Sequence, residues 1–518
     1  MSSPISEISR SSGTALEHRA ARVSLVNGFS TVLTVGIQLV SVPVCLHYWG
    51  KQAYGSWLAL LSAYLLLRGL DGGYAAFVGN KLNYLYHQST RALRDHLSSA
   101  VFGVVMVGSL QIALAAGAVI LNPVSAALGM SMDGAGGTAN KLGLLALITS
   151  WVLTGSYLGI VYRLLIPAGL MYQAAWWAIA YPICQFAAVI VSAILRLELL
   201  SAALLFAASQ MAVSVSIALY VRRALPRFTP WLDGAKARVG IRDFGHSLFL
   251  TGSNLVQQAT TNGSVLLVSV LAGPVAVSTF TTVRTLTILW NSVTTILSAP
   301  LLPDVVRMHA TGEVKKLVAT NRAYWVLAGS AVNLGAVLSF PLIPRLYATW
   351  TVGAVALDRP LLCLLLGSAV AANSGALIAV HLNGINSLRI VLGTSVTRAV
   401  LTLGVGAMCF PRYGLAAFGF GALAGEILAT LITVSYFVRY EVEKKGSIVP
   451  IADFGPISLS TGSVILYFLG ASLGFWSVGY VWLLTAIVVI VASLWGWRTL
   501  DDELQSRLLG IPIKLLGF

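Results

Sequence analysis

The sequence predicts an all-α polytopic membrane protein with about 14 transmembrane helices, and two observations support this prediction. First, 57% of the 518 residues are hydrophobic and only 10% are charged, at a mean hydropathy of +0.83, a composition that excludes a soluble globule. Second, apolar runs of about 20 residues recur between short polar connectors, which is the length that a helix needs to cross about 30 Å of hydrocarbon. Strands of a membrane barrel would instead alternate over about 10 residues.

The apolar runs define the expected elements in chain order. We place the spans at roughly 23–46, 54–79, 98–121, 142–166, 175–195, 200–221, 246–271, 277–303, 322–342, 359–382, 388–410, 413–438, 456–475 and 477–497. The first twelve form two pseudo-symmetric six-helix lobes, and the last two are extra C-terminal helices. The resulting segments are a cytoplasmic tail (1–22), an N-lobe (23–221), a basic cytoplasmic interlobe linker (222–245), a C-lobe (246–438), a cytoplasmic connector (439–455), the two extra helices (456–497) and a second cytoplasmic tail (498–518).

Basic residues predict the orientation. The net charge of +15 would suggest nucleic acid in a soluble protein, but here Lys and Arg gather in the connectors between spans. Cytoplasmic loops normally collect such residues, so we place both termini in the cytoplasm and expect bilayer lipids, not nucleic acid, as partners. No charged segment followed by a short apolar core and a cleavage site opens the chain, so we predict no removable signal.

A weak internal repeat indicates that the two lobes are related. The residues that open the second span are Gly50, Tyr54, Gly55 and Trp57, and those that open the eighth are Gly273, Val277, Ser278 and Phe280. From position 50 to position 273 the offset is 223 residues. Six-span repeats are a recurrent transporter architecture that holds the substrate between lobes near the midplane.

Three arginines, Arg68, Arg284 and Arg398, fall near the middles of apolar runs. Each such charge costs roughly 2.5 to 3.5 kcal/mol on an insertion scale, so we expect the protein to bind an anion. A fourth arginine, Arg163, is close enough to a span end to reach the interface, and we interpret it as an anchor.

Two acids, Asp71 and Glu426, lie deep within spans. Asp71 follows Arg68 by three residues, so the two could neutralise each other as a structural pair. Glu426 is either the partner of Arg398 or a carrier of protons or sodium ions. Either acid could couple ion flow to transport, or both could be structural counter-ions.

Polar residues within four spans recur at helical spacing and so form stripes. The stripes comprise Asn27, Thr31, Thr34, Gln38 and Ser41 in the first span; Tyr64, Arg68 and Asp71 in the second; Asn254, Gln257, Gln258, Thr261 and Asn262 in the seventh; and Thr287, Asn291, Thr294 and Ser298 in the eighth. Amides and hydroxyls that face lipid would lack partners, so we expect these faces to line a watered cavity. The alternative is polar packing between neighbouring helices.

Little in the sequence supports an enzymatic function. The motifs GxxxxGK[ST] and HExxH are absent from it. The cysteines Cys45, Cys184, Cys363 and Cys409 lie in or beside apolar runs without the spacing of a metal site, and we interpret them as small core residues. We therefore predict a protein that is not an enzyme and needs no metal or organic cofactor, with proton or sodium coupling left open.

Several short segments resemble bacterial polysaccharide repeat-unit flippases of the multidrug/oligosaccharidyl-lipid/polysaccharide exporter superfamily. In the first half these are Gly50-Lys51-Gln52-Ala53-Tyr54-Gly55-Ser56-Trp57, then Gly69-Leu70-Asp71-Gly72-Gly73 and Asn80. In the second half they are Leu271-Ala272-Gly273 with the later Arg284, and Leu302-Pro303-Asp304 leading to Gly312-Glu313. The resemblance covers about 30 to 440 in topology, and its motifs are short.

The resemblance implies that the protein moves an undecaprenyl-diphosphate-linked oligosaccharide across the bacterial inner membrane, for O-antigen or exopolysaccharide biosynthesis, by alternating access. Polysaccharide polymerase and export machinery would be its partners. Arginine suits phosphate oxygens, so we expect Arg68, Arg284 and Arg398 to bind the diphosphate. The sugars would face Asn27, Thr31, Thr34, Gln38, Asn254, Gln257, Gln258, Thr261, Asn262 and Asn291. In the related lipid II flippase the extra pair of spans bears a lipid-tail groove, which 456–497 resembles.

Two other functions compete with this interpretation. One is a cation-coupled multidrug extruder of the same superfamily, whose pocket should be acidic and aromatic. The other is a membrane polysaccharide polymerase, which usually shows one large outer loop. The longest outer connector here, from Asn122 to Lys141, is rich in Gly and Ala and carries one acid, Asp133.

Overall fold

The computed structural model describes residues 4–86, 89–121, 135–229, 231, 233–298, 301–385, 387–443, 455–475, 479–500 and 505. Within these ranges the side chains of residues 4–28, 31, 135, 136, 303, 388 and 441 are not described. The side chains of Asn27 and Thr31, which we expect in the cavity, therefore lie outside the described part. Every regular element in the described ranges is a helix, which confirms the predicted all-α class.

The chain forms two compact units, Met1–Gln258 with Ala272–Val275, and Ala259–Leu271 with Ala276–Phe518. The boundary at Gln258 falls inside the expected seventh span and not in segment 222–245, where the sequence places the interlobe linker. The reason is packing, because the helix that ends at Gln258 lies against the first two helices of its own unit.

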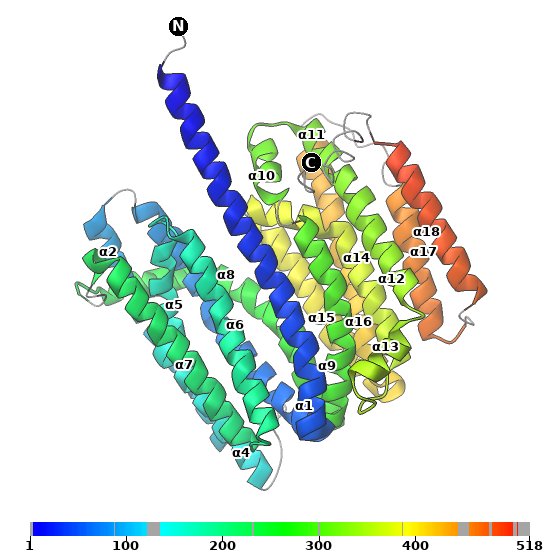
Figure 1. Cartoon of the computed structure of the whole chain (residues 1–518), viewed down its shortest axis with the longest axis horizontal. Coiled ribbons are helices and arrows are strands. Elements are labelled where there is room, and N and C mark those ends of the chain that lie inside the picture. The colour runs from blue at the N-terminus through cyan, green and yellow to red at the C-terminus, as the bar shows by residue number, and fades with distance from the viewer. Residues whose placement is uncertain are drawn as a thin grey trace. The chain divides into compact units, whose positions relative to one another are not determined.

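The first unit is built from helices that pack around α1. Its elements are α1 (Pro4–Tyr86), α2 (Thr90–Ile120), α4 (Ala135–Ser150), η1 (Trp151–Ser156), α5 (Tyr157–Tyr162), η2 (Arg163–Leu165), α6 (Met171–Ile194), α7 (Leu199–Ala224), η3 (Pro226–Phe228) and α8 (Ala237–Gln258). Helices α6 and α7 run side by side (Figure 1), and α8 packs on α1 and α2. A buried apolar cluster that includes Tyr74, Leu97, Leu164 and Phe228 joins α1, α2, η2 and η3.

The second unit holds the remaining helices. They are η4 (Ala259–Gly263), most of α9 (Ser264–Ser298), α10 (Leu302–Ala310), α11 (Val314–Tyr324), η6 (Trp325–Gly329), α12 (Ser330–Ser339), α13 (Ile343–Trp350), α14 (Arg359–Gly384), α15 (Leu388–Tyr413), α16 (Ala416–Tyr436), η7 (Phe437–Val442), α17 (Gly455–Ser472) and α18 (Tyr480–Arg498). Helix α16 packs on α14 and α15. The extra helices α17 and α18 lie side by side (Figure 1).

Ten helices in the described ranges are long and apolar enough to cross a membrane, and the bent pair Val314–Ser339 and Ile343–Trp350 would be an eleventh. Two of the ten, Val32–Tyr86 and Ala237–Ser298, each contain one expected span in full and most of another. The expected span 456–475 corresponds to α17, which is 18 residues long and is not among the ten. The chain is thus a multi-pass membrane protein in which neighbouring spans merge into long broken helices. Helix α1 begins at Pro4, well before the expected first span.

The two long helices break at the pair of glycines that the repeat singled out. Gly50 in α1 has φ 74° and ψ 169°, and Gly273 in α9 has φ 77° and ψ −179°. This region of backbone space is accessible essentially to glycine alone. The aromatic residues seven positions later are equally buried, with Trp57 and Phe280 each 2% exposed. The same local structure therefore recurs at the offset of the repeat.

Substituting Gly50 with alanine is expected to destabilise the protein by about 1–3 kcal/mol through backbone strain. No atom lies within 4 Å of the added methyl group, so crowding would not contribute. The matched control is Gly36→Ala in the same helix, which is equally uncrowded and has a helical backbone, and it should be neutral or slightly stabilising. Thermal unfolding in detergent, followed by intrinsic fluorescence, measures both. Equal midpoints for the two variants would contradict the strain argument.

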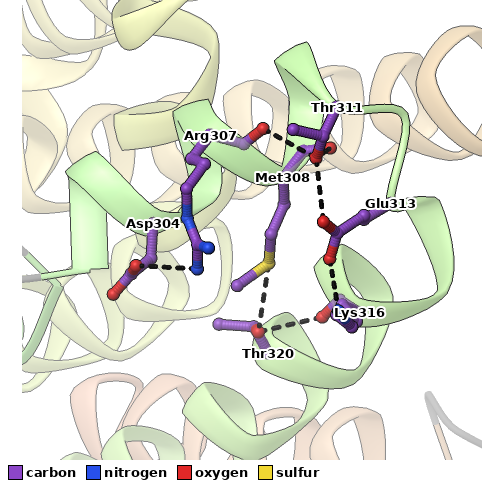
Figure 2. A network of polar contacts seen from close by, with 7 residues as sticks. All are labelled: Asp304, Arg307, Met308, Thr311, Glu313, Lys316 and Thr320. Atoms are coloured by element: carbon purple, nitrogen blue, oxygen red, sulfur yellow. Dashed lines mark hydrogen bonds and ion pairs between the residues drawn. The ribbon is translucent and has the colours of Figure 1, made fainter. Parts of the chain in front are cut away.

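The connector from α10 to α11 carries exposed ion pairs (Figure 2). Arg307 lies 3.3 Å from Asp304, and Lys316 lies 2.6 Å from Glu313. The Lys316 ammonium and the Thr311 hydroxyl lower the pKa of the Glu313 carboxyl below its ordinary value. Gly312 turns the chain with φ 71°. Exposed pairs of this kind contribute little stability, so we interpret the segment as a surface connector.

Candidate functional site: an arginine-lined pocket

A pocket of about 560 Å³ lies within the first unit. Its lining comes from α1, from the segment η1–α5–η2 and from the end of α8. The polar and aromatic residues that line it are Arg68, Asp71, Trp151, Ser156, Tyr162, Arg163, Asn254 and Gln258. The structure thus brings together four residues that the sequence assigns to the site, namely Arg68, Asp71, Asn254 and Gln258.

Trp151 holds the two charged residues of α1 in place. Its indole Nε1 donates a hydrogen bond of 2.7 Å to Oδ2 of Asp71, and the Arg68 guanidinium carbon lies 3.8 Å from the ring centroid. Although both side chains are described, Arg68 and Asp71 form no direct ion pair. Asp71 is 6% exposed, so its carboxylate is held inside the protein by the indole. The ring face stabilises the positive charge of Arg68 without engaging its N–H donors.

Gly155 explains how Trp151 reaches this position. A methyl group on Gly155 would lie 2.2 Å from a carbon of the indole ring, so the ring rests directly on the helix backbone. Both residues belong to η1, a π-helical turn. Such turns occur frequently at functional sites because the extra residue redirects side chains.

The glycines of α1 bring α8 to the pocket. A methyl group on Gly69 would lie 2.7 Å from Cγ of Gln258, and one on Gly72 would lie 2.2 Å from Nδ2 of Asn254. At this short separation Asn254 donates a hydrogen bond of 2.9 Å to the carbonyl oxygen of Gly69. The run Gly69 to Gly73 therefore serves close packing of two helices, as small residues commonly do in membrane proteins.

Arg163 is a site residue that the sequence did not predict. We interpreted it as an anchor that reaches the interface, but it lines the same pocket as Arg68, with its side chain against Gly79. Among the described residues its guanidinium has no hydrogen-bond or ion-pair partner. With two arginines and one aspartate, the pocket carries a net positive formal charge and is suited to an anion.

In the second unit, Arg284 is fixed to the backbone of its own unit. Its Nη1 donates hydrogen bonds to the carbonyl oxygen of Thr261 (2.6 Å) and to Oγ of Ser264 (3.4 Å). The guanidinium carbon also lies 5.5 Å from the ring centroid of Phe280. The π-helical turn η4 supplies Thr261.

Arg398 forms an ion pair with Glu426. Its Nε lies 2.8 Å from Oε2 of Glu426, and the two side chains are 29% and 21% exposed. Of the two roles left open for Glu426, the structure shows the partner of Arg398. The charge of Arg398 therefore has a counter-ion within the protein.

The residues of the polar stripes differ in whether they are bonded inside the protein or exposed at its surface. Several hydroxyls donate to carbonyl oxygens of their own helices, in the way that the polar-packing alternative allows: Thr34 to Ser30, Ser41 to Ile37, Thr287 to Arg284 and Thr294 to Trp290. Thr287, Thr294 and Ser298 are also buried, and Thr294 donates to Asn373. Those three do not offer hydroxyls to a cavity. Gln257, Thr261 and Asn291 are exposed, Gln38 is half-buried, and Asn262 is buried at 6% exposure.

Comparison with known proteins identifies the fold. No protein-family profile and no curated sequence matches the chain. Among solved structures, the lipid II flippase MurJ in an inward closed conformation is similar at a TM-score of 0.63 and 14% identity, over 95% of this chain and 99% of that chain. An inward-facing MATE multidrug resistance transporter of the MOP superfamily is similar at 0.55 and 16%, over 79% and 93%. The Vibrio cholerae MATE transporter VcmN in its bent form is similar at 0.53 and 14%, over 90% and 100%.

The chain is therefore an all-α, multi-pass membrane protein with a cationic pocket in its first unit. Its fold is the one shared by MurJ and the MATE transporters of the MOP superfamily.

Proposed function

We propose that the protein is a flippase. It translocates a polyprenyl-diphosphate-linked oligosaccharide repeat unit from the cytoplasmic to the periplasmic leaflet of a bacterial inner membrane by alternating access. Its product then supplies polysaccharide polymerisation and export. The proposal rests on one observation, which is that Arg68 and Arg163 line the same pocket among membrane-spanning helices.

The chemistry of the cargo matches these charges. A diphosphate brings about two negative charges into a medium of low dielectric, where they must be paired. Arg68 and Arg163 offer planar sets of donors to its oxygens, and Asn254 and Gln258 lie beside them as partners for sugar hydroxyls. Arg284 and Arg398 are the candidates in the second unit, and Arg398 would first have to leave Glu426.

Ion coupling is part of this proposal. Asp71 and Glu426 are the acids that could bind a proton or a sodium ion and so couple its inward movement to the outward movement of the cargo. Asp71 accepts a hydrogen bond from Trp151, whose ring also contacts Arg68. Glu426 forms an ion pair with Arg398. Substrate-driven proton or sodium uptake into proteoliposomes tests this step, and unchanged uptake in the Asp71→Asn and Glu426→Gln variants would remove it.

The second candidate is a cation-coupled multidrug extruder, which the similarity to MATE folds favours. A pocket for organic cations should be acidic, whereas this pocket holds two arginines and one aspartate. The charge balance therefore favours the anionic cargo. The three similar structures reported above are a flippase and two transporters, and none of them is a polymerase.

Substituting Arg68, Arg163 or Arg284 singly with alanine is expected to lower glycan translocation in cells by about 10- to 100-fold, since hydrogen bonds to charged groups are worth about 1.5–3 kcal/mol. Surface polysaccharide and the lipid-linked repeat unit accumulated inside the cell are measured together. The matched control is Arg307→Ala, an arginine whose side chain is 65% exposed. Full export by all three site variants at normal protein level would refute the assignment.

A further inference from the structure

A second, smaller pocket of about 140 Å³ adjoins the arginine-lined pocket inside the first unit. The two share the lining residues Trp151, Gly155, Gly159 and Tyr162. The far wall of the second pocket comes from α6 and α7, through Trp177, Tyr181 and Ile217. One helical segment, η1–α5, therefore lines both a cationic pocket and an aromatic one.

The aromatic pocket presents ring faces and few polar groups. The indole N–H of Trp151 already donates a hydrogen bond to Asp71. The Tyr162 hydroxyl donates to the carbonyl oxygen of Ala174, and the hydroxyls of Tyr181 and Ser214 bond to each other. A sugar ring placed here would leave its own hydroxyls without partners, which is costly. A hydrocarbon group would lose nothing by the same placement.

The size of the pocket matches a small hydrocarbon. An engineered apolar cavity of about 150 Å³ binds benzene, so about 140 Å³ suits a group of five or six carbons. A lipid-linked diphosphate carries such a group next to its phosphates, because the first isoprene unit is attached there. Phosphate oxygens at Arg68 and Arg163 would bring that unit to the shared residues.

We propose that the aromatic pocket binds the first isoprene unit of the carrier lipid while the arginine-lined pocket binds its diphosphate. This inference rests on the proposed function. It assigns recognition of the lipid carrier, independently of the glycan, to the first unit alone. The protein then distinguishes prenyl diphosphates from other diphosphate esters by burying a branched C5 group.

The experiment compares two ligands of equal charge, methyl diphosphate and dimethylallyl diphosphate, by titration calorimetry on the purified full-length protein in lipid nanodiscs. We expect the dimethylallyl ester to bind at least about 10-fold more tightly, because four additional carbons leave water. Ala178→Leu should bring this ratio close to one, since Ala178 lines the aromatic pocket but not the arginine-lined pocket. The matched control is Ala180→Leu on the same helix, which does not line the pocket.

Each other outcome has a defined meaning. Equal binding of the two esters by the unsubstituted protein would overturn the isoprene pocket and leave the proposed function standing. Binding of neither ester would overturn the diphosphate site, and with it both proposals. A diphosphate bearing glucose and a methyl group serves as a third ligand, and if Ala178→Leu weakened only that ligand, the pocket would hold a sugar and the inference would be wrong.

Discussion

Asp243→Ala is expected to destabilise the protein by about 3–5 kcal/mol, the usual cost of removing one member of a buried ion cluster. Asp243 is fully buried on α8. Its carboxylate accepts a hydrogen bond of 2.9 Å from Lys81 on α1 and lies 3.2 Å from Nδ1 of His96 on α2. Removing it leaves two basic groups facing each other at the junction of three helices.

The matched control is Asp304→Ala, which removes an aspartate from an ion pair whose side chains are 54% and 65% exposed. That change should cost no more than about 1 kcal/mol. Thermal unfolding midpoints and the yield of monodisperse protein in size-exclusion chromatography report both variants. Similar losses of stability in Asp243→Ala and Asp304→Ala would show that burial of the aspartate does not decide the cost of removing it.

Gly73→Val is expected to separate α8 from α1 and to abolish the arginine-lined pocket. The added Cβ would lie 2.2 Å from the backbone nitrogen of Thr251 and 2.3 Å from its Cα. Backbone atoms cannot move aside as a side chain can, so the helices must part, at a cost of about 1–3 kcal/mol or more. Asn254 and Gln258 would then leave Gly69 and Gly72.

The measurement combines folded yield with methyl diphosphate binding, because the variant should lose ligand affinity even where it stays folded. Gly252→Ala on α8 is the matched control, since no atom lies within 4 Å of its added methyl group. Unchanged affinity in Gly73→Val would show that the contact of α1 with α8 does not shape the site.

The fold class and several site residues could be predicted from spacing along the chain. Apolar runs of membrane length force helices, because backbone groups in hydrocarbon must bond internally. Arg68, Asp71, Asn254 and Gln258 line one pocket, and all four belong to the polar stripes that helical spacing defines. The glycines of the repeat mark real breaks at Gly50 and Gly273.

Three features of the site depend on contacts that spacing does not reveal. Trp151 donates a hydrogen bond to Asp71 although 80 positions separate the two residues, and the predicted polar stripes include no residue of its span. Arg163 turns inward against Gly79, although its place near a span end suggested an anchor. The small residues Gly155 and Gly159 follow Trp151 at helical spacing, and this pattern is the signal in the sequence for a packed or open helix face there.

By itself, the sequence determined the membrane class, the long helices and the cost of carrying arginines among them, because these follow from local hydropathy and helical periodicity. Only the tertiary structure decided which charges are satisfied within the protein. Arg398 meets Glu426 and Asp243 meets Lys81, whereas Arg163 lines a pocket. The physical reason is that pairing depends on distances of a few ångströms between helices far apart in the chain, and helical spacing within one segment carries no information about them.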